Sequence, residues 1–365
     1  MKKYFLLFAI LASSLEADIN FSGDARVRPR LDVKDNGDGS STSDFYFLYR
    51  ARVNLKADIG EGWFFSSKLA VNSASGMSHM GKVDDLAPDI TSSYPGITSS
   101  YRPSASFSEA YFGYADDSCG FWSGAFPLKY NSSLDLHFYS GAYGEDNLVD
   151  IPFAVFSNSS VTGFAGYNTV LSQKFNWFLS VDKDLVEVKS FSDDQDDVKN
   201  NNNYTLGLDL TVDAGPVSLT PRALVSFGGA EGESSPATYG ADLKLPELAG
   251  FATGLSYYMS ALGSDGDAGS YHADHARFSV SGPLGKGKLK LFYDMASSKN
   301  FDLDETNKLS FVWLAYSHTL YKGESGAVTV SPTYRLQNGK NPSDCCYNED
   351  YSRSKFEVTV HMKFK

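Results

Sequence analysis

The sequence contains no apolar run long enough to form a transmembrane helix. A helix that crosses a bilayer needs about 20 mostly apolar residues, and the N-terminal run Tyr4–Ala12 is much shorter. Membrane residence, if any, must therefore be through strands. The run follows two lysines and precedes small residues that end near Ala17, which is typical of a secretory signal peptide. We expect residues 1–17 to be removed and residues 18–365, which show no linker or break in composition, to form one domain.

Cysteine and basic residues are also scarce. The three cysteines are Cys119, Cys345 and Cys346, and no pair has the spacing of a four-ligand zinc site. Lys and Arg number 32 against 44 Asp and Glu, and the net charge of −12 argues against a nucleic-acid partner. Among the six histidines, His272 and His275 are close, but a strand would place them on opposite faces. This arrangement disfavours an enzyme and a metal site.

What the sequence does contain is alternation of apolar and polar residues. Between Asp44 and Ile59 nearly every second residue is apolar, and most of the others are polar or charged. Because successive strand residues point to opposite faces, such a strand suits a position between lipid and an aqueous lumen. The pattern predicts sixteen strands: Ile19–Val33, Asp44–Ile59, Trp63–Val71, Phe107–Ala115, Phe121–Lys129, Val161–Thr169, Lys174–Asp184, Tyr204–Asp213, Pro216–Phe227, Tyr239–Leu245, Phe251–Ala261, His272–Ser281, Lys288–Ala296, Lys308–Thr319, Val328–Leu336 and Phe356–Phe364.

The connections between these segments alternate between seven short ones and eight long ones. Outer-membrane barrels have short periplasmic turns and long extracellular loops, and an even number of strands leaves both chain ends in the periplasm. No internal repeat supports a propeller or a solenoid. Aromatic residues make up 14% of the chain, and 32 residues are glycine. The sequence therefore predicts an all-β fold, a transmembrane antiparallel β-barrel of about 16 strands.

The last strand, Phe356–Phe364, adds a resemblance to a known family. Its alternation resembles the final strand by which Gram-negative outer-membrane proteins are recognised for insertion, so Phe364 is the candidate insertion signal, although Lys365 follows it. Over nearly the whole mature chain the architecture resembles that of general bacterial porins. The resemblance implies a water-filled channel for passive diffusion of ions and small hydrophilic solutes, in the outer membrane of a Gram-negative bacterium, with no enzymatic activity and no cofactor.

The resemblance also implies partners and a constriction. In the porin family the second long loop, here Asn72–Ser104, often latches onto a neighbouring subunit of a homotrimer. The surroundings would be outer-membrane lipid and lipopolysaccharide, and the barrel assembly machinery would insert the chain. The third long loop, here Tyr130–Ser160, would fold into the lumen and narrow it. That loop contains the acidic residues Asp135, Glu145, Asp146 and Asp150.

The polar face of the strands would line the channel, because sixteen strands enclose an aqueous lumen. Five arginines of this face lie on the first two predicted strands. We hypothesise that they form a basic wall that favours anions and faces the acidic third loop. The alternative is that they pair locally with Asp24, Asp32 and Asp44. The predicted basic wall residues are Arg26, Arg28, Arg30, Arg50, Arg52, Lys56, Arg222, Arg277 and Arg335.

Three tryptophans, Trp63, Trp122 and Trp177, lie near short turns or strand starts on the apolar side of the alternation. Indole rings favour the headgroup level of a membrane. We therefore expect these residues to form an aromatic girdle at the periplasmic interface.

Two other interpretations stay open. A non-conducting structural or adhesive surface barrel would use its long loops, and conduction by the purified protein distinguishes it from a channel. Asp35, Asp38 and Gly39, and separately Asp265 with Asp267, faintly resemble calcium loops. Neither continues to the bidentate glutamate of such a loop. Ordinary turn chemistry explains both better, and calcium, if bound, would bridge to lipopolysaccharide.

Overall fold

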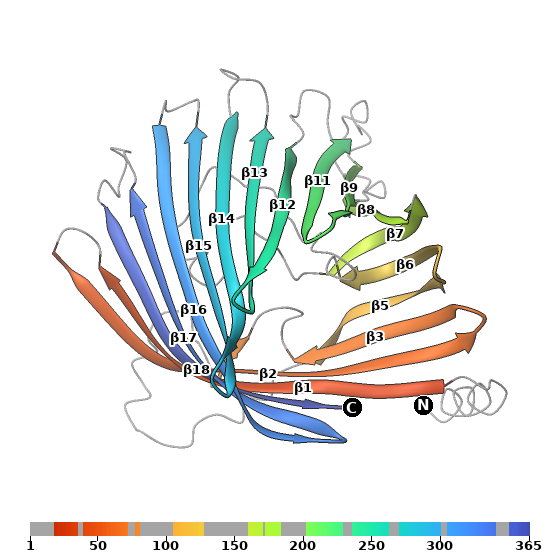
Figure 1. The fold of residues 1–365 in the computed structure, drawn as a ribbon, viewed down its shortest axis with the longest axis horizontal. Helices are drawn as coiled ribbons and strands as arrows, with labels where there is room; N and C mark the ends of the chain where they lie inside the picture. Colours follow the sequence, from red (N-terminus) through yellow and green to blue (C-terminus); the bar gives the residue numbers. More distant parts are fainter. Residues whose placement is uncertain are drawn as a thin grey trace, which may run out of the picture.

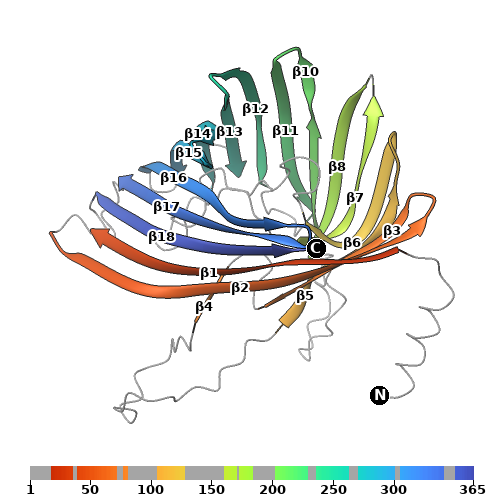
Figure 2. The same cartoon turned by 60° about the horizontal axis from the view of Figure 1, so that its bottom comes forward.

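The computed structural model describes residues 18–35, 39–71, 77–80, 105–127, 160–170, 172–183, 202–228, 236–262, 270–300, 305–340 and 350–365. These residues form one antiparallel sheet that closes on itself. It closes because β1 (Asp18–Asp35) pairs with β2 (Ser41–Gly60) on one side and with β18 (Tyr351–Phe364) on the other. Figure 1 shows the sheet curved around a central space, and Figure 2 shows β1 and β18 side by side. None of the residues described forms a helix long and apolar enough to cross a membrane.

Sixteen long strands build the described wall. β9 and β10 are two parts of one strand that is interrupted at Thr211, and β4 is a two-residue strand that pairs with Leu48 and Tyr49 of β2. The other bounds are β3 Trp63–Val71, β4 Ser78–His79, β5 Ala105–Ala115, β6 Cys119–Pro127, β7 Ser160–Val170, β8 Gln173–Lys183, β9 Asn203–Leu210, β10 Val212–Ala214, β11 Val217–Gly228, β12 Ala237–Leu248, β13 Phe251–Leu262, β14 Tyr271–Leu284, β15 Gly287–Asn300, β16 Glu305–Gly323 and β17 Gly326–Lys340.

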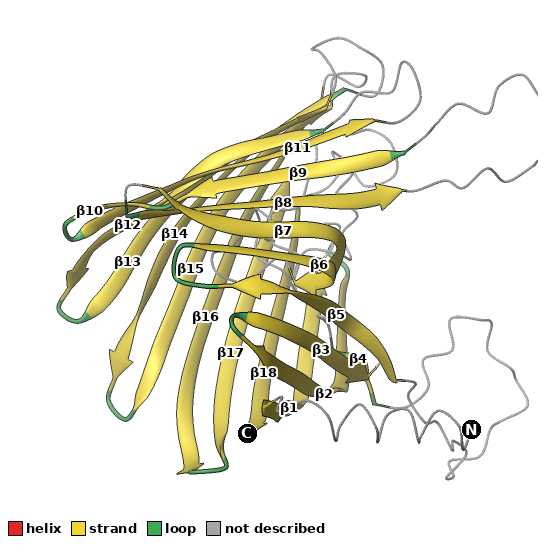
Figure 3. Ribbon diagram, turned by 90° about the vertical axis from the view of Figure 1, so that its right-hand side faces the viewer, coloured by secondary structure: helices red, strands yellow, loops and turns green. Residues whose placement is uncertain are grey.

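The predicted fold class is confirmed, since each of the sixteen predicted segments overlaps one wall strand. Two or three residues separate the strands at the seven predicted short connections. Leu171, between β7 and β8, lies outside the described residues, and Figure 3 draws the described turns in green. Several strands are longer than predicted at their other ends. β15 and β16, for example, leave only residues 301–304 between them where a connection over Ser297–Asn307 was expected.

The alternation separates the two faces of the wall. Large apolar side chains such as Phe21, Phe45 and Phe47 are exposed on the outer face, as lipid contact requires. Charged neighbours such as Asp24 and Arg50 are buried on the inner face, where they contact one another. The sequence pattern therefore assigns both faces of the first two strands correctly.

Part of the inner face is apolar. On these strands the alternation of apolar and polar residues does not tell which side chains point into the lumen. One cluster joins β6, β7, β8, β11 and β13, and a second joins β14, β15, β16 and β18. The members of the first are Trp122, Phe126, Ala165, Tyr167, Phe178, Leu224 and Tyr258, and those of the second are Ala273, Ala296, Leu309, Phe311 and Tyr351.

Trp122 corrects the predicted aromatic girdle. Its side chain is only 4% exposed and packs inside the barrel, whereas the adjacent Phe121 points outward. The prediction was wrong because β6 has apolar residues on both faces, so alternation cannot assign the facing of Trp122. Trp63 is 52% exposed on the outer face, and Trp177 contacts the outward Phe121, with 6.1 Å between ring centroids.

Closure brings the first strand, β1, into close contact with its neighbours β2 and β18 at Gly23. A Cβ at this position would lie 2.3 Å from Cζ of Phe364 and 2.4 Å from the carbonyl oxygen of Arg52. Real Cβ atoms do not approach other atoms this closely, so the position needs glycine, and the aromatic ring of the last strand covers it.

We therefore expect Gly23→Val to lower the free energy of unfolding by about 2 kcal/mol, because β1 must shift from β2 and β18. Denaturant unfolding of the refolded barrel in detergent measures this change. The matched control is Ala25→Val, which adds a similar side chain two residues further along the same outward face. Equal stability of Gly23→Val and the control would contradict the close approach.

Candidate functional site

The inner face at the junction of β1, β2, β17 and β18 carries a dense group of charges, which we call the basic cluster. Three carboxylates, from Asp24, Asp32 and Glu357, hold its cations together. The cations are Arg26, Arg28, Arg30, Arg50, Arg52, Arg335, Arg353 and Lys355.

Glu357 on β18 is the most buried of these carboxylates. Arg30 Nε and Nη2 lie 2.8 and 2.7 Å from Oε2, and Arg335 Nη2 donates to Oε1 at 2.7 Å. Arg28 lies 3.5 Å from Oε1 and donates to the Thr359 hydroxyl at 2.8 Å. The side chains of Arg30 and Glu357 are 2% and 1% exposed, so each charge depends on the other for compensation.

Asp24 on β1 gathers a second group. Arg52 Nε donates to Oδ1 at 2.6 Å, Arg50 Nη2 donates to Oδ2 at 3.1 Å, and Arg26 Nε lies 3.3 Å from Oδ2. His361 of β18 reaches the same oxygen at 3.4 Å. One carboxylate therefore neutralises part of the charge of three arginines.

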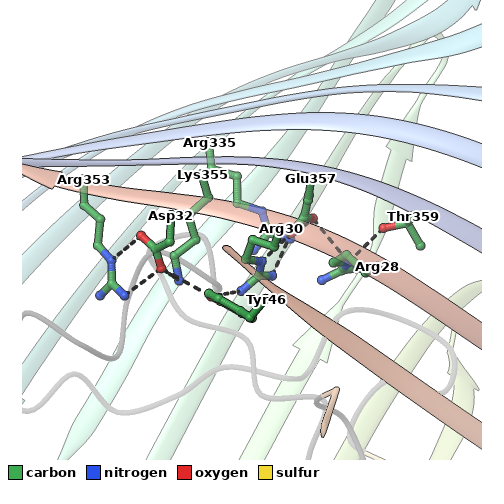
Figure 4. Close-up of polar contacts among 9 residues, drawn as sticks. All are labelled: Arg28, Arg30, Asp32, Tyr46, Arg335, Arg353, Lys355, Glu357 and Thr359. Atoms are coloured by element: carbon green, nitrogen blue, oxygen red, sulfur yellow. Dashed lines mark hydrogen bonds and ion pairs between the residues drawn. The ribbon is translucent and has the colours of Figure 1, made fainter. Parts of the chain in front are cut away.

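Asp32, eight residues further along β1, binds the start of β18. Arg353 donates two hydrogen bonds to its two oxygens, both at 2.9 Å, and Lys355 lies 3.1 Å away. Tyr46 donates to the same carboxylate at 3.3 Å and accepts from Arg30 at 3.4 Å. Figure 4 shows how Tyr46 links the Asp32 group to the Glu357 group.

The basic cluster has eight cationic side chains for three carboxylates. Local pairing, the alternative considered for the five arginines, is therefore present, but it involves Asp24 and Glu357 and leaves a net positive charge. Pairing explains how so many guanidinium groups lie together, and the excess charge gives this side of the lumen a positive potential.

On the opposite side of the barrel, carboxylates outnumber the cation that they contact. In the closed ring of sixteen strands, β11 lies eight strands from β1 in either direction. Arg222 of β11 lies 2.8 Å from Asp242 and 3.9 Å from Asp209, so one cation faces two carboxylates. The ion-paired group at β1 thus carries a net positive charge, whereas the group of Arg222, Asp209 and Asp242 carries a net negative charge.

The other predicted wall residues lie on the inner face but outside this group. Arg277 makes two hydrogen bonds to Asp294, at 2.7 and 3.1 Å. Lys56 lines a hollow beside aromatic side chains. Arg335 belongs to the basic cluster and also stacks on Trp313, with 4.2 Å from Cζ to the ring centroid.

Three members of the cluster were not predicted as site residues. Glu357 lies on the polar side of the predicted last strand, and Arg353 and Lys355 precede the predicted start of that strand. The polar side of β18 continues through both residues, because the strand begins at Tyr351. Extending the alternation by five residues would have found them.

Several predicted features lie outside the described residues. They are the signal segment 1–17, most of the Asn72–Ser104 loop, the third-loop acids Asp135, Glu145, Asp146 and Asp150, the cysteines Cys345 and Cys346, and the calcium-like residues Asp38, Asp265 and Asp267. Phe364 is described and lies over Gly23 on the outer face.

Comparison with solved structures identifies the architecture. The chain is similar to an anion-selective porin from Comamonas acidovorans, with a TM-score of 0.59 over 96% of this chain and 100% of that chain. It is also similar to the outer membrane channel DcaP of Acinetobacter baumannii (TM-score 0.58, covering 95% and 97%). A third neighbour is OmpT, an outer membrane protein of Vibrio cholerae in trimer form (TM-score 0.53, covering 95% and 99%). The fold is that of outer-membrane porins.

This likeness lies in the fold and not in the sequence. Each of the three neighbours is 12% identical to the chain. No protein-family profile matches the sequence, and no curated protein sequence matches it. The porin fold explains the position of the basic cluster on the inner face, while the residues of the cluster are read from this chain alone.

Glu357→Gln should destabilise the barrel strongly. Arg30 and Arg335 would keep their buried charges without the carboxylate that compensates them, at a cost of about 3 kcal/mol or more. Denaturant unfolding of the refolded barrel measures the loss.

Glu324→Gln is the matched control, because Glu324 is exposed in the turn between β16 and β17 and should tolerate the change. If Glu357→Gln unfolds at the same denaturant concentration as the parent protein and the control, Glu357 does not hold the junction together.

Proposed function

We propose that the protein is an outer-membrane channel through which ions and small hydrophilic solutes diffuse passively, with a preference for anions. The basic cluster carries this proposal: eight cations with three carboxylates line one side of the porin-fold lumen. Cationic rings and ladders in a pore favour anions. One protein with the same fold is described as an anion-selective porin, and the proposal extends that property to this chain because of its own cluster.

The two sides of the lumen support selection by a transverse field. Charges of opposite sign on facing walls orient dipolar solutes and draw anions toward the arginines. Arg222 with Asp209 and Asp242 supplies the negative side within the described wall. The acids of the third loop, Asp135, Glu145, Asp146 and Asp150, would add to it if that loop folds into the lumen.

The setting of the channel is part of the proposal. The porin fold and the outward apolar band favour the outer membrane of a Gram-negative bacterium, with lipid and lipopolysaccharide around the barrel. We propose a homotrimer, in line with the trimer form of one neighbour. Phe364 would serve the barrel assembly machinery as the insertion signal, and Trp63 and Trp177 would lie at the periplasmic headgroups.

A channel also accounts for His275 and His361 better than an enzyme does. His275 lies 3.7 Å from Asp294, and that carboxylate already binds Arg277. His361 shares Asp24 with three arginines. In both places the carboxylate also binds arginine, so it is not dedicated to orienting His275 or His361 as a catalytic base.

Single-channel recording in a planar bilayer tests conduction. We expect discrete open levels, and levels that close in threes if the protein is a trimer. A folded barrel that inserts without conducting would favour the structural or adhesive interpretation and would exclude a channel.

Replacing the two more exposed arginines, in the variant Arg26→Ser with Arg52→Ser, tests selectivity. Removing two charges from the positive side should lower the anion-to-cation permeability ratio by about twofold. The reversal potential in a salt gradient reports this ratio. Lys340→Ser is the control, because it removes an exposed lysine on the outer face of β17. An unchanged permeability ratio in the double variant would show that the basic cluster does not determine the ion selectivity.

A further inference from the structure

A second basic feature lies inside the barrel, away from the basic cluster. A hollow of about 320 Å³ lies against the inner face of β2, β3, β5, β6, β7 and β8. Small-molecule sites of proteins begin at about this size. Figure 3 shows β3, β5, β6 and β7 side by side, with a short turn between β5 and β6. The residues that the argument uses are Lys56, Phe64, Tyr111, Trp122, Tyr167 and Lys174.

Four aromatic rings form one wall of the hollow, each from a different neighbouring strand. Phe64 meets Tyr111 edge to face at 6.0 Å and Trp122 at 6.4 Å, and Trp122 meets Tyr167 at 6.1 Å. These centroid distances are typical of attractive ring pairs. The rings therefore hold one another in place and form a rigid apolar wall.

Small residues leave the space beside these rings. A Cβ at Gly120 would lie 2.4 Å from Cε1 of Tyr167, so this ring lies flat against the backbone of β6. Ala115 of β5 also lines the hollow. The Tyr167 hydroxyl donates to the backbone carbonyl of Asp116 in the turn after β5, which fixes the ring from its other end.

Two lysines supply the charge. Lys174 Nζ lies 3.6 Å from the centroid of the Tyr167 ring, and Lys56 lines the same hollow from β2. Within the part of the chain that the structure describes, neither lysine makes an ion pair, and no carboxylate lines the hollow. This distinguishes them from the arginines of the basic cluster, each of which contacts a carboxylate.

Two carboxylates near the adjoining turns, Asp58 and Asp116, accept hydrogen bonds from groups of those turns. Asp58 accepts a hydrogen bond from the Gly60 N–H at 3.0 Å. Asp116 accepts from the Tyr114 hydroxyl at 2.6 Å and from the Ser118 and Cys119 N–H groups at 2.7 and 2.8 Å. These hydrogen bonds, that of Tyr114 above all, hold the pKa of Asp116 well below its ordinary value. Asp116 thus stays an anion committed to its own turn.

We propose that this hollow is a binding site for small aromatic carboxylates. The flat ring of the ligand would pack against Phe64 and Tyr111, and its carboxylate would accept hydrogen bonds from Lys56 and Lys174. Apolar walls with a few convergent polar groups are the usual composition of a ligand site. A charge-assisted hydrogen bond to an ammonium group is stronger than a neutral one, so an anion is preferred over a neutral ring. The inference rests on the proposed function only in that solutes must reach the lumen.

Benzoate binding to the folded barrel in detergent, followed by isothermal titration calorimetry, tests the site without requiring conduction. We expect saturable binding of benzoate. Benzamide and acetate should each bind at least about tenfold more weakly, since benzamide lacks the carboxylate and acetate lacks the aromatic ring. Lys174→Gln and Lys56→Gln should each weaken benzoate binding by about tenfold, the effect of losing one charge-assisted hydrogen bond.

The matched control is Lys290→Gln. Lys290 also lies on the inner wall over an aromatic ring, 4.6 Å from the centroid of Phe292, but outside this hollow. Its replacement should leave benzoate binding unchanged. No saturable binding, equal binding of acetate, or equal loss in Lys290→Gln would each overturn the proposal.

Conduction and binding fail separately in this design. A barrel that conducts without binding benzoate would refute the site and leave the channel function in place. A barrel that binds benzoate with the expected variant effects but does not conduct would refute the channel and leave the site in place.

Discussion

Closure of the sheet between β1 and β18 is the constraint on which the rest of the structure depends. A backbone N–H or C=O group that faces hydrocarbon without a partner costs several kcal/mol, so a membrane sheet cannot keep a free edge. The two strands that close this one lie at opposite ends of the chain, and Arg28 reaches Thr359 across 331 positions. Three carboxylates bridge the same junction from the inside. Closure therefore rests on backbone pairing, on the ion pairs and on the contact of Phe364 with Gly23.

The strands could be predicted because successive side chains of a strand point to opposite faces. One face contacts lipid and the other contacts water, so apolar and polar residues alternate along the chain. Which side chains point into the lumen could be predicted only for strands whose lumen side is polar. On β6 and β16 the inner face carries Trp122, Phe126, Leu309 and Phe311, so both sides of each strand are apolar. Alternation does not assign the facing of residues there, which explains the wrong facing predicted for Trp122.

Contacts within the site needed information that alternation lacks. Facing places Arg30 and Glu357 on the same side, but only the register of β1 against β18 places them opposite each other. Arg335 reaches Glu357 diagonally, since its direct partner in the register is Lys355. The sequence could therefore predict that the lumen near β1 is basic, but not which carboxylates hold the arginines or how much charge remains.

The two groups of cations in this lumen act by different physics. The basic cluster acts at a distance, through an excess charge that salt screens over about 8 Å at physiological ionic strength. Lys56 and Lys174 act on contact, beside aromatic rings whose apolar attraction salt does not screen. A solute with only a charge lacks the apolar half of this contact and responds mainly to the first group, whereas a flat aromatic anion responds to both. Added salt should separate them, because it weakens the preference for simple anions more than the retention of aromatic ones.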